Sequence, residues 1–194
     1  MLSATEIAHG TQGAIRVLQL DPGAPFQYDN TPEACLRSFR VIVLAAPLYA
    51  FYILINYARV DVAADDFEVL LVEALRYVID WLFYPVVFYE IARHRGWLDR
   101  YPRYIALLNW INLPQIILIV IGTALASVVP GPVATVLVLA LQLFLFYWFM
   151  AATRLALGVG WAIAGVLLAI NFVPMLLLSR VIDSILGVAR IAGG

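Results

Sequence analysis

Lysine is absent from the sequence, and cysteine and histidine are scarce. The chain holds one cysteine, Cys35, and two isolated histidines, His9 and His94. A single cysteine excludes an internal disulfide, and without a Cys/His cluster there is no metal-ligand spacing. Thirteen acidic residues oppose twelve arginines, so the net charge of −1 offers no basic face for nucleic acid. We therefore expect no metal, no other cofactor and no nucleic-acid partner.

Sequence motifs of the common enzyme classes are also lacking. The chain has no Gly-x-Ser-x-Gly, no phosphate-binding glycine loop and no His-Glu-x-x-His. No second intramembrane aspartate is available to pair with Asp80 for hydrolysis. Four carboxylates lie close together between residues 61 and 68, but they lack the glycine turn and the closing glutamate of a calcium loop. We predict that the protein is not an enzyme.

Hydrophobic residues are what the chain has in excess. They make up 64% of the sequence, charged residues only 13%, and the mean hydropathy is +0.92. This composition predicts an integral membrane protein in a lipid bilayer. A transmembrane helix needs roughly 17 to 25 apolar residues. We expect an all-α, polytopic membrane bundle of five transmembrane helices, at residues 41–58, 67–92, 104–129, 133–153 and 155–179.

The two ends of the chain are expected to lie outside the bilayer core. Residues 1–36 form a polar cytosolic lead-in, in which Thr11 to Leu20 is either a short amphipathic helix or part of a loosely ordered tail. Thr31 can cap a helix that starts at Pro32. Residues 37–194 form the membrane domain. Its last part, residues 181–191, has the periodicity of an interfacial helix.

Arginines predict the orientation in the membrane. They precede the first span at Arg37 and Arg40, and they recur in the connection between the second and third spans, from Arg93 to Arg103. Short loops rich in arginine stay in the cytoplasm. We expect a multi-pass protein of the inner (cytoplasmic) membrane with its N-terminus in the cytoplasm. Arg180 and Arg190 oppose this scheme at the C-terminal end, so a re-entrant fifth segment is the alternative.

The second predicted span carries charges, which are costly at membrane depth and usually face protein or water. Glu73, Arg76 and Asp80 lie at i, i+3 and i+7 and share one helix face, whereas Glu90 belongs at the cytoplasmic rim near Arg93. One interpretation is a structural ion-pair knot, and the other is a polar cavity in which a carboxylate changes its protonation. In either case, the polar residues expected to join the site are Asn112, Gln115, Gln142 and Asn171.

The spacing of the spans and a few local motifs resemble the Yip family of five-span membrane proteins, which has bacterial members. The resemblance covers residues 35–188 and rests on Tyr101-Pro102-Arg103-Tyr104, on Leu113-Pro114, and on the aromatic segment 144–150 that leads into Leu157-Gly158. It implies a cytosolic lead-in and five closely spaced spans. The Asp-Leu-Tyr-Gly-Pro-type motif of eukaryotic members is not matched at residues 28–32, so binding of Ypt/Rab GTPases is not expected.

Two functions follow as hypotheses. The first is a scaffold or accessory subunit without chemistry of its own, which acts through other membrane proteins or as a homo-oligomer. The alternative is a small-solute or proton-linked permease component that uses the charged second helix. The chain lacks the internal inverted repeat common in secondary transporters, which favours the first hypothesis.

Overall fold

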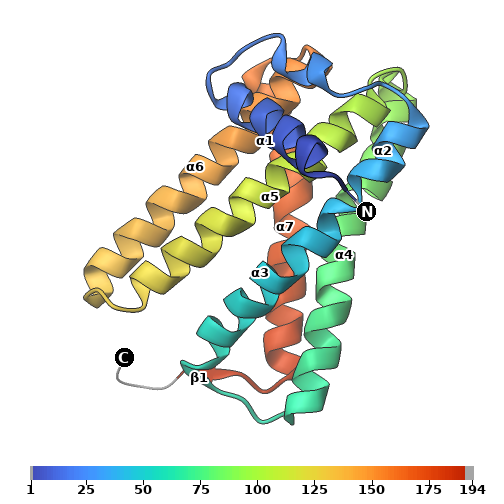
Figure 1. The fold of residues 1–194 in the computed structure, drawn as a ribbon. Coiled ribbons are helices and arrows are strands. Elements are labelled where there is room, and N and C mark those ends of the chain that lie inside the picture. Colours follow the sequence, from blue (N-terminus) through green and yellow to red (C-terminus); the bar gives the residue numbers. More distant parts are fainter. Residues whose placement is uncertain (1, 191–194) are drawn as a thin grey trace.

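The computed structural model describes residues 2–190, which are almost entirely helical (Figure 1). In chain order the elements are α1 (Ala4–Leu18), the 3₁₀ helix η1 (Ala24–Gln27), α2 (Pro32–Ser38), α3 (Val41–Tyr57), β1 (Val60–Asp61), α4 (Asp66–Arg95), α5 (Tyr101–Ala126), α6 (Gly131–Leu157), α7 (Trp161–Ile185) and β2 (Ala189–Arg190). The predicted all-α class is confirmed.

Four helical segments within residues 2–190 are long and apolar enough to cross a membrane, which indicates a membrane protein. They are Pro32–Tyr57, Tyr101–Ala126, Gly131–Leu157 and Trp161–Ile185. The first joins α2 to α3, and Thr31 caps it as predicted, since its hydroxyl accepts a hydrogen bond from the Ala34 amide. α4 is the longest helix, with 30 residues, but it is not among the four. A fifth span therefore remains a prediction.

Helix α5 forms the centre of the fold. It packs against α1, α2, α3 and α6, while α7 packs against α4 and α6. Tyr104, Ile105 and Leu107 on α5 are fully buried, and a helix that is apolar on all sides is expected to be enclosed by others. In Figure 1, α5 and α6 form a hairpin that diverges from α3, α4 and α7 toward one end of the molecule.

The N-terminal segment is docked onto the helices, not loosely ordered. α1 begins at Ala4, earlier than the predicted Thr11, because Ser3 and Glu6 form a reciprocal capping box. It lies across one end of α5 and α6 (Figure 1). The Trp148 indole donates to the Ala14 carbonyl at 2.9 Å, and the Tyr28 hydroxyl donates to the Gly10 carbonyl at 2.6 Å.

The boundary between the fourth and fifth predicted spans was wrong. We placed it at Arg154, but α6 continues to Leu157 and α7 starts only at Trp161. Gly158 ends α6, since its φ of 66° is a left-handed conformation that favours glycine. Arg154 stays inside the helix, with its guanidinium 5.0 Å from the centre of the Trp161 ring.

The predicted interfacial helix at residues 181–191 is also wrong, as far as Arg190; residue 191 lies outside the described residues. Instead, α7 runs past Arg180 to Ile185, and Gly187 turns the chain with a φ of 61°. β2 then pairs antiparallel with β1. This pairing ties the connection between α3 and α4 to the segment after α7.

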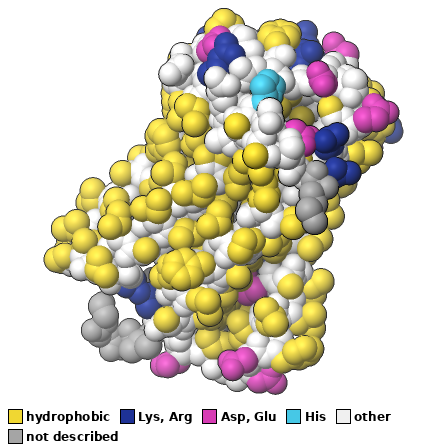
Figure 2. All heavy atoms as spheres, in the orientation of Figure 1, with side chains coloured by type: hydrophobic (Ala, Val, Ile, Leu, Met, Phe, Trp, Pro, Cys, Tyr) yellow, Lys and Arg dark blue, Asp and Glu magenta, His cyan; other side chains and the backbone are white. Residues whose placement is uncertain are grey.

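Charged side chains gather at the two ends of the molecule, and the surface between them is mainly hydrophobic (Figure 2). The end formed by α1, α2 and the α4–α5 connection carries most of the arginines. The opposite end carries Asp61, Asp65, Asp66 and Glu68. Such a distribution is typical of a protein whose middle lies in a bilayer.

Candidate functional site

The charged residues of α4 form a linked stripe, as their spacing predicts. The Arg76 guanidinium places Nη1 at 3.5 Å from Glu73 Oε1 and Nε at 3.8 Å from Asp80 Oδ2. The three residues together have a formal charge of −1. Glu90 lies apart from them, as expected, in an exposed ion pair with Arg93 at 3.6 Å.

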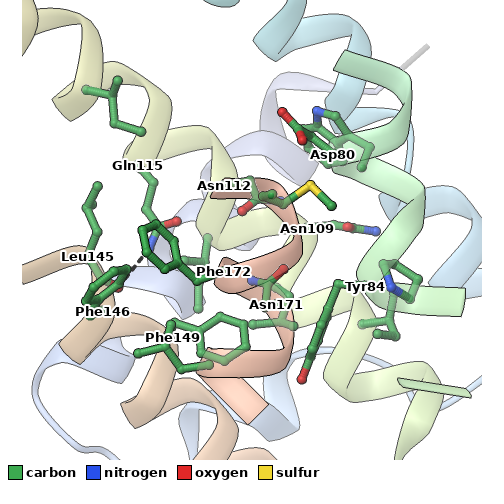
Figure 3. A pocket seen from close by; sticks show the side chains of 18 of the residues that line it. Asp80, Tyr84, Asn109, Asn112, Gln115, Leu145, Phe146, Phe149, Asn171 and Phe172 are labelled. Atoms are coloured by element: carbon green, nitrogen blue, oxygen red, sulfur yellow. Dashed lines mark hydrogen bonds between the residues drawn. The ribbon is translucent and has the colours of Figure 1, made fainter. Parts of the chain in front are cut away.

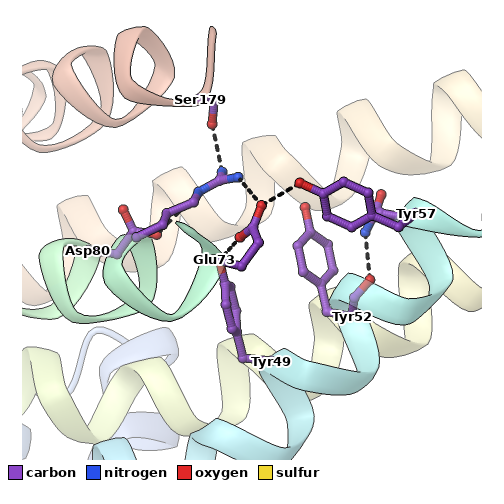
Figure 4. A network of polar contacts seen from close by, with 8 residues as sticks. Tyr49, Tyr52, Tyr57, Glu73, Asp80 and Ser179 are labelled. Atoms are coloured by element: carbon purple, nitrogen blue, oxygen red, sulfur yellow. Dashed lines mark hydrogen bonds and ion pairs between the residues drawn. The ribbon is translucent and has the colours of Figure 1, made fainter. Parts of the chain in front are cut away.

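Glu73 is the buried member of the stripe, with 2% of its surface exposed. Figure 4 shows how α3 and α7 surround it. The hydroxyls of Tyr49 and Tyr57 each donate to one carboxylate oxygen, both at 2.7 Å. Arg76 also donates to Ser179 Oγ on α7, at 2.6 Å. The negative charge of Glu73 is thus compensated by one cation and two hydroxyls, which fixes α3, α4 and α7 relative to one another.

The prediction that amide side chains complete this knot is wrong. Within residues 2–190, none of the four predicted amides bonds to Glu73, Arg76 or Asp80, and the partners are the hydroxyls of Tyr49, Tyr57 and Ser179 instead. Glu73 is the more buried of the two carboxylates, with 3% of its side chain exposed against 33% for Asp80. Tyr49 and Tyr57 lie two helical turns apart on one face, a spacing that could have signalled a shared partner.

The amides lie instead around a cavity of about 250 Å³ between α4, α5, α6 and α7, which we call the central cavity. Asp80 lines it from α4, and the side chain of Asp80 is 33% exposed. The structure therefore brings together all of the predicted site residues except Glu73 and Arg76. Figure 3 shows several of them around this space. The predicted residues in its lining are Asp80, Asn112, Gln115, Gln142 and Asn171.

Three side-chain amides of the central cavity have no hydrogen-bond partner among the described residues. Gln115 Nε2 lies 3.5 Å from the Leu145 carbonyl, which is the limit of a hydrogen bond. Across the described residues, no hydrogen bond to another protein group satisfies the Asp80 carboxylate or the side-chain amides of Asn112, Gln142 and Asn171. Asn109 differs, because it donates to Ser38 Oγ at 2.8 Å. The cavity thus presents free donors and acceptors to whatever fills it.

A second space of about 300 Å³, the side cavity, lies on the other side of Asp80 between α3, α4 and α5. Asp80, Asn112 and Gln115 line both cavities. Arg76 lines only the side cavity, and Asp80 is the one charged residue among the described residues that line the central cavity. The two cavities therefore differ in charge.

The rest of the central cavity is aromatic and aliphatic. Phe146, Phe149 and Phe172 contribute rings from α6 and α7, and the Phe146 and Phe172 centroids are 4.7 Å apart. A largely apolar pocket with a few convergent polar groups is the usual form of a small-molecule site. Among residues 2–190, no group of three or more His, Cys, Asp or Glu residues is placed to hold a metal ion.

The chain was compared with protein-family models, curated proteins and solved structures, and no match was found in any of the three comparisons.

Proposed function

We propose that this protein is a five-span integral membrane protein that binds a small polar solute in the central cavity and acts as a permease component. One observation carries this proposal. A carboxylate and four amides, contributed by four different helices, converge on one cavity, and three of these amides have no protein partner among the described residues. Intramembrane polar residues are costly, and they mark substrate or proton pathways by default.

The length of α4 supports its inclusion as a span. Its 30 residues correspond to about 45 Å at 1.5 Å per residue, which exceeds the roughly 30 Å of a bilayer core. The arginine-rich α4–α5 connection and the arginines of α2 lie at the end that α1 covers. By the positive-inside rule this end faces the cytoplasm, which places the N-terminus there, in the inner membrane.

The different surroundings of the two carboxylates, Glu73 and Asp80, support binding of the solute at Asp80. Glu73 has its charge fully compensated by Arg76, Tyr49 and Tyr57. Asp80 has only a 3.8 Å ion pair with Arg76 on one side and an open cavity on the other. A carboxylate in this position can take up or release a proton together with a solute.

Proton flux into proteoliposomes tests this function. Vesicles that contain purified protein and the pH indicator pyranine are given an inside-negative potassium diffusion potential, and internal acidification is recorded. We expect acidification with the wild type and with Glu90→Gln, because Glu90 lies in an exposed pair outside the cavity. Asp80→Asn should abolish it. Equal rates with wild type, Asp80→Asn and empty vesicles would reject a proton pathway through Asp80.

A scaffold or accessory subunit is the second candidate, and a different surface favours it. An apolar groove of about 710 Å³ runs between α2, α4 and α5. Leu36 and Val86 line it with 71% and 66% of their surface exposed. The transmembrane helix of another protein, or of a second copy, would fit such a groove, in keeping with the resemblance to the Yip family. Purification in mild detergent that yields only the monomer would count against this role.

A further inference from the structure

The charge balance of the central cavity favours a cationic guest. Arg76 is shared between Glu73 and Asp80, so the three residues keep a formal charge of −1. Asp80 is the one charged residue in the described lining of the cavity, and its ion pair with Arg76 is long, at 3.8 Å. A cation bound there would pair with a carboxylate that is otherwise costly at membrane depth. An anion would meet repulsion from Asp80.

The polar groups beside Asp80 favour a cation that carries N–H groups. An ammonium group donates up to three hydrogen bonds. Asp80 and Asn112 both line the central and side cavities, whereas the Gln115 amide points toward the Leu145 carbonyl on α6 (Figure 3). The Asp80 carboxylate and the Asn112 amide oxygen supply acceptors on the Asp80 side, and the Asn112 side chain has no other partner among the described residues.

The opposite part of the cavity suits an apolar body. Phe146, Phe149 and Phe172 line it together with Leu168 and Met175. The volume of about 250 Å³ exceeds that of an engineered cavity of about 150 Å³ that holds benzene. A phenyl ring with one aminomethyl group can therefore be accommodated.

We propose that the central cavity binds an organic monoamine in its ammonium form, with the ammonium group at Asp80 and Asn112 and the apolar body among the phenylalanines. This inference rests on the proposed function in taking the central cavity as the solute site. It adds the charge and the hydrogen-bonding character of the solute.

Equilibrium binding to the full-length protein in nanodiscs tests the proposal with benzylammonium, benzamide and benzoate. These probes share a phenyl ring and differ in charge. We expect benzylammonium to bind at least about tenfold more tightly than benzamide, because hydrogen bonds to charged groups are stronger than those between neutral groups. Benzoate should show no measurable binding. Benzyltrimethylammonium, which keeps the charge but has no N–H, should also bind at least about tenfold more weakly than benzylammonium.

Variants locate the binding site. Asp80→Asn should lose at least about tenfold in affinity for benzylammonium and little for benzamide, whereas Phe149→Leu should weaken both probes. Asn112→Leu gives a second test of the ammonium site should Asp80→Asn fail to fold. Glu90→Gln is the matched control, since it removes a carboxylate from the same helix outside the cavity, and it should change neither affinity.

Several outcomes would overturn the inference. Benzamide that binds as tightly as benzylammonium would show a neutral-solute site, which leaves the proposed function intact. Equal binding of benzyltrimethylammonium would show that the aromatic rings, not the oxygens, hold the cation. If none of the probes binds, the inference fails, and Asp80-dependent proton flux would still support the permease function by itself.

Discussion

Replacing Arg76 with alanine removes the cation that holds two carboxylates of α4. At an effective dielectric constant of about 20, each of its ion pairs, at 3.5 Å to Glu73 and 3.8 Å to Asp80, corresponds to about 4 to 5 kcal/mol of Coulomb attraction. Much of this attraction offsets the desolvation of the three charged groups in the native protein. The measurable loss is therefore smaller than the sum of the two pairs.

The loss in the variant comes mainly from Glu73. Leaving a buried charge unpaired costs about 3 to 5 kcal/mol, and Glu73 is only 2% exposed. It keeps the hydroxyls of Tyr49 and Tyr57, and Asp80 faces a cavity. We therefore expect the lower end, about 3 kcal/mol. For a chain of this length that corresponds to a fall in Tm of about 6 to 12 °C.

The single cysteine provides the assay. Cys35 is a free thiol with 6% of its surface exposed, so a thiol-reactive fluorescent dye reports its exposure when the detergent-solubilised protein is heated. Arg93→Ala is the matched control, because it breaks an exposed pair on the same helix and should cost less than about 1 kcal/mol. The double variant Arg76→Ala/Glu73→Gln should regain part of the stability lost in Arg76→Ala, because it no longer leaves a buried charge without its cation. If Arg76→Ala melted at the wild-type temperature, the burial argument for Glu73 would be refuted.

Two further predictions concern the docking of α1. A side chain at Gly10 would clash with the Trp110 ring, whose nearest atom is 2.2 Å from an added Cβ. Gly10→Leu should therefore weaken the docking of α1 by about 1 to 3 kcal/mol and increase the cleavage of α1 by trypsin. Gly160→Leu, where a Cβ would meet open space, should have neither effect. Hydrogen bonds from the Ser3 amide and from Arg37 lower the pKa of Glu6 from 4.5 to about 2. Its stabilising effect is therefore present above pH 4.5 and is lost as the pH falls toward 2. The rate at which pepsin cleaves α1 in the wild type, divided by the rate in Glu6→Gln at the same pH, should rise as the pH falls across that window.

Local signals in the sequence predicted the helices well. The segment expected at residues 41–58 is α3, at Val41–Tyr57, and the helix start at Thr31 is correct. Both depend on neighbouring residues, namely flanking arginines and a capping hydroxyl. The errors arose where a charge was taken as a helix end. Arg154 and Arg180 both lie inside helices, and glycines with positive φ mark the turns that follow.

The sequence predicted which residues of the candidate site share a helix face, but not which residues of other helices they contact. The periodicity of α4 predicted that Glu73, Arg76 and Asp80 share a face, and that is how they lie. Which other helix meets each carboxylate depends on packing between distant segments. Tyr49 and Tyr57 on α3 reach Glu73, while the amides of α5, α6 and α7 surround the space beside Asp80. Helical periodicity does not contain that information.

The pairing of β1 with β2 links some helices of the bundle, but not others, at the end opposite α1. It joins the α3–α4 connection to the segment that follows α7, so α3, α4 and α7 are linked to one another at this end. α5 and α6 diverge from them toward this end and are joined to each other by the short turn at residues 127–130 (Figure 1). The central cavity lies between α4 and α7 on one side and this hairpin on the other. The two walls of the cavity thus differ in how they are tied at this end, one by strand pairing and the other by a single turn.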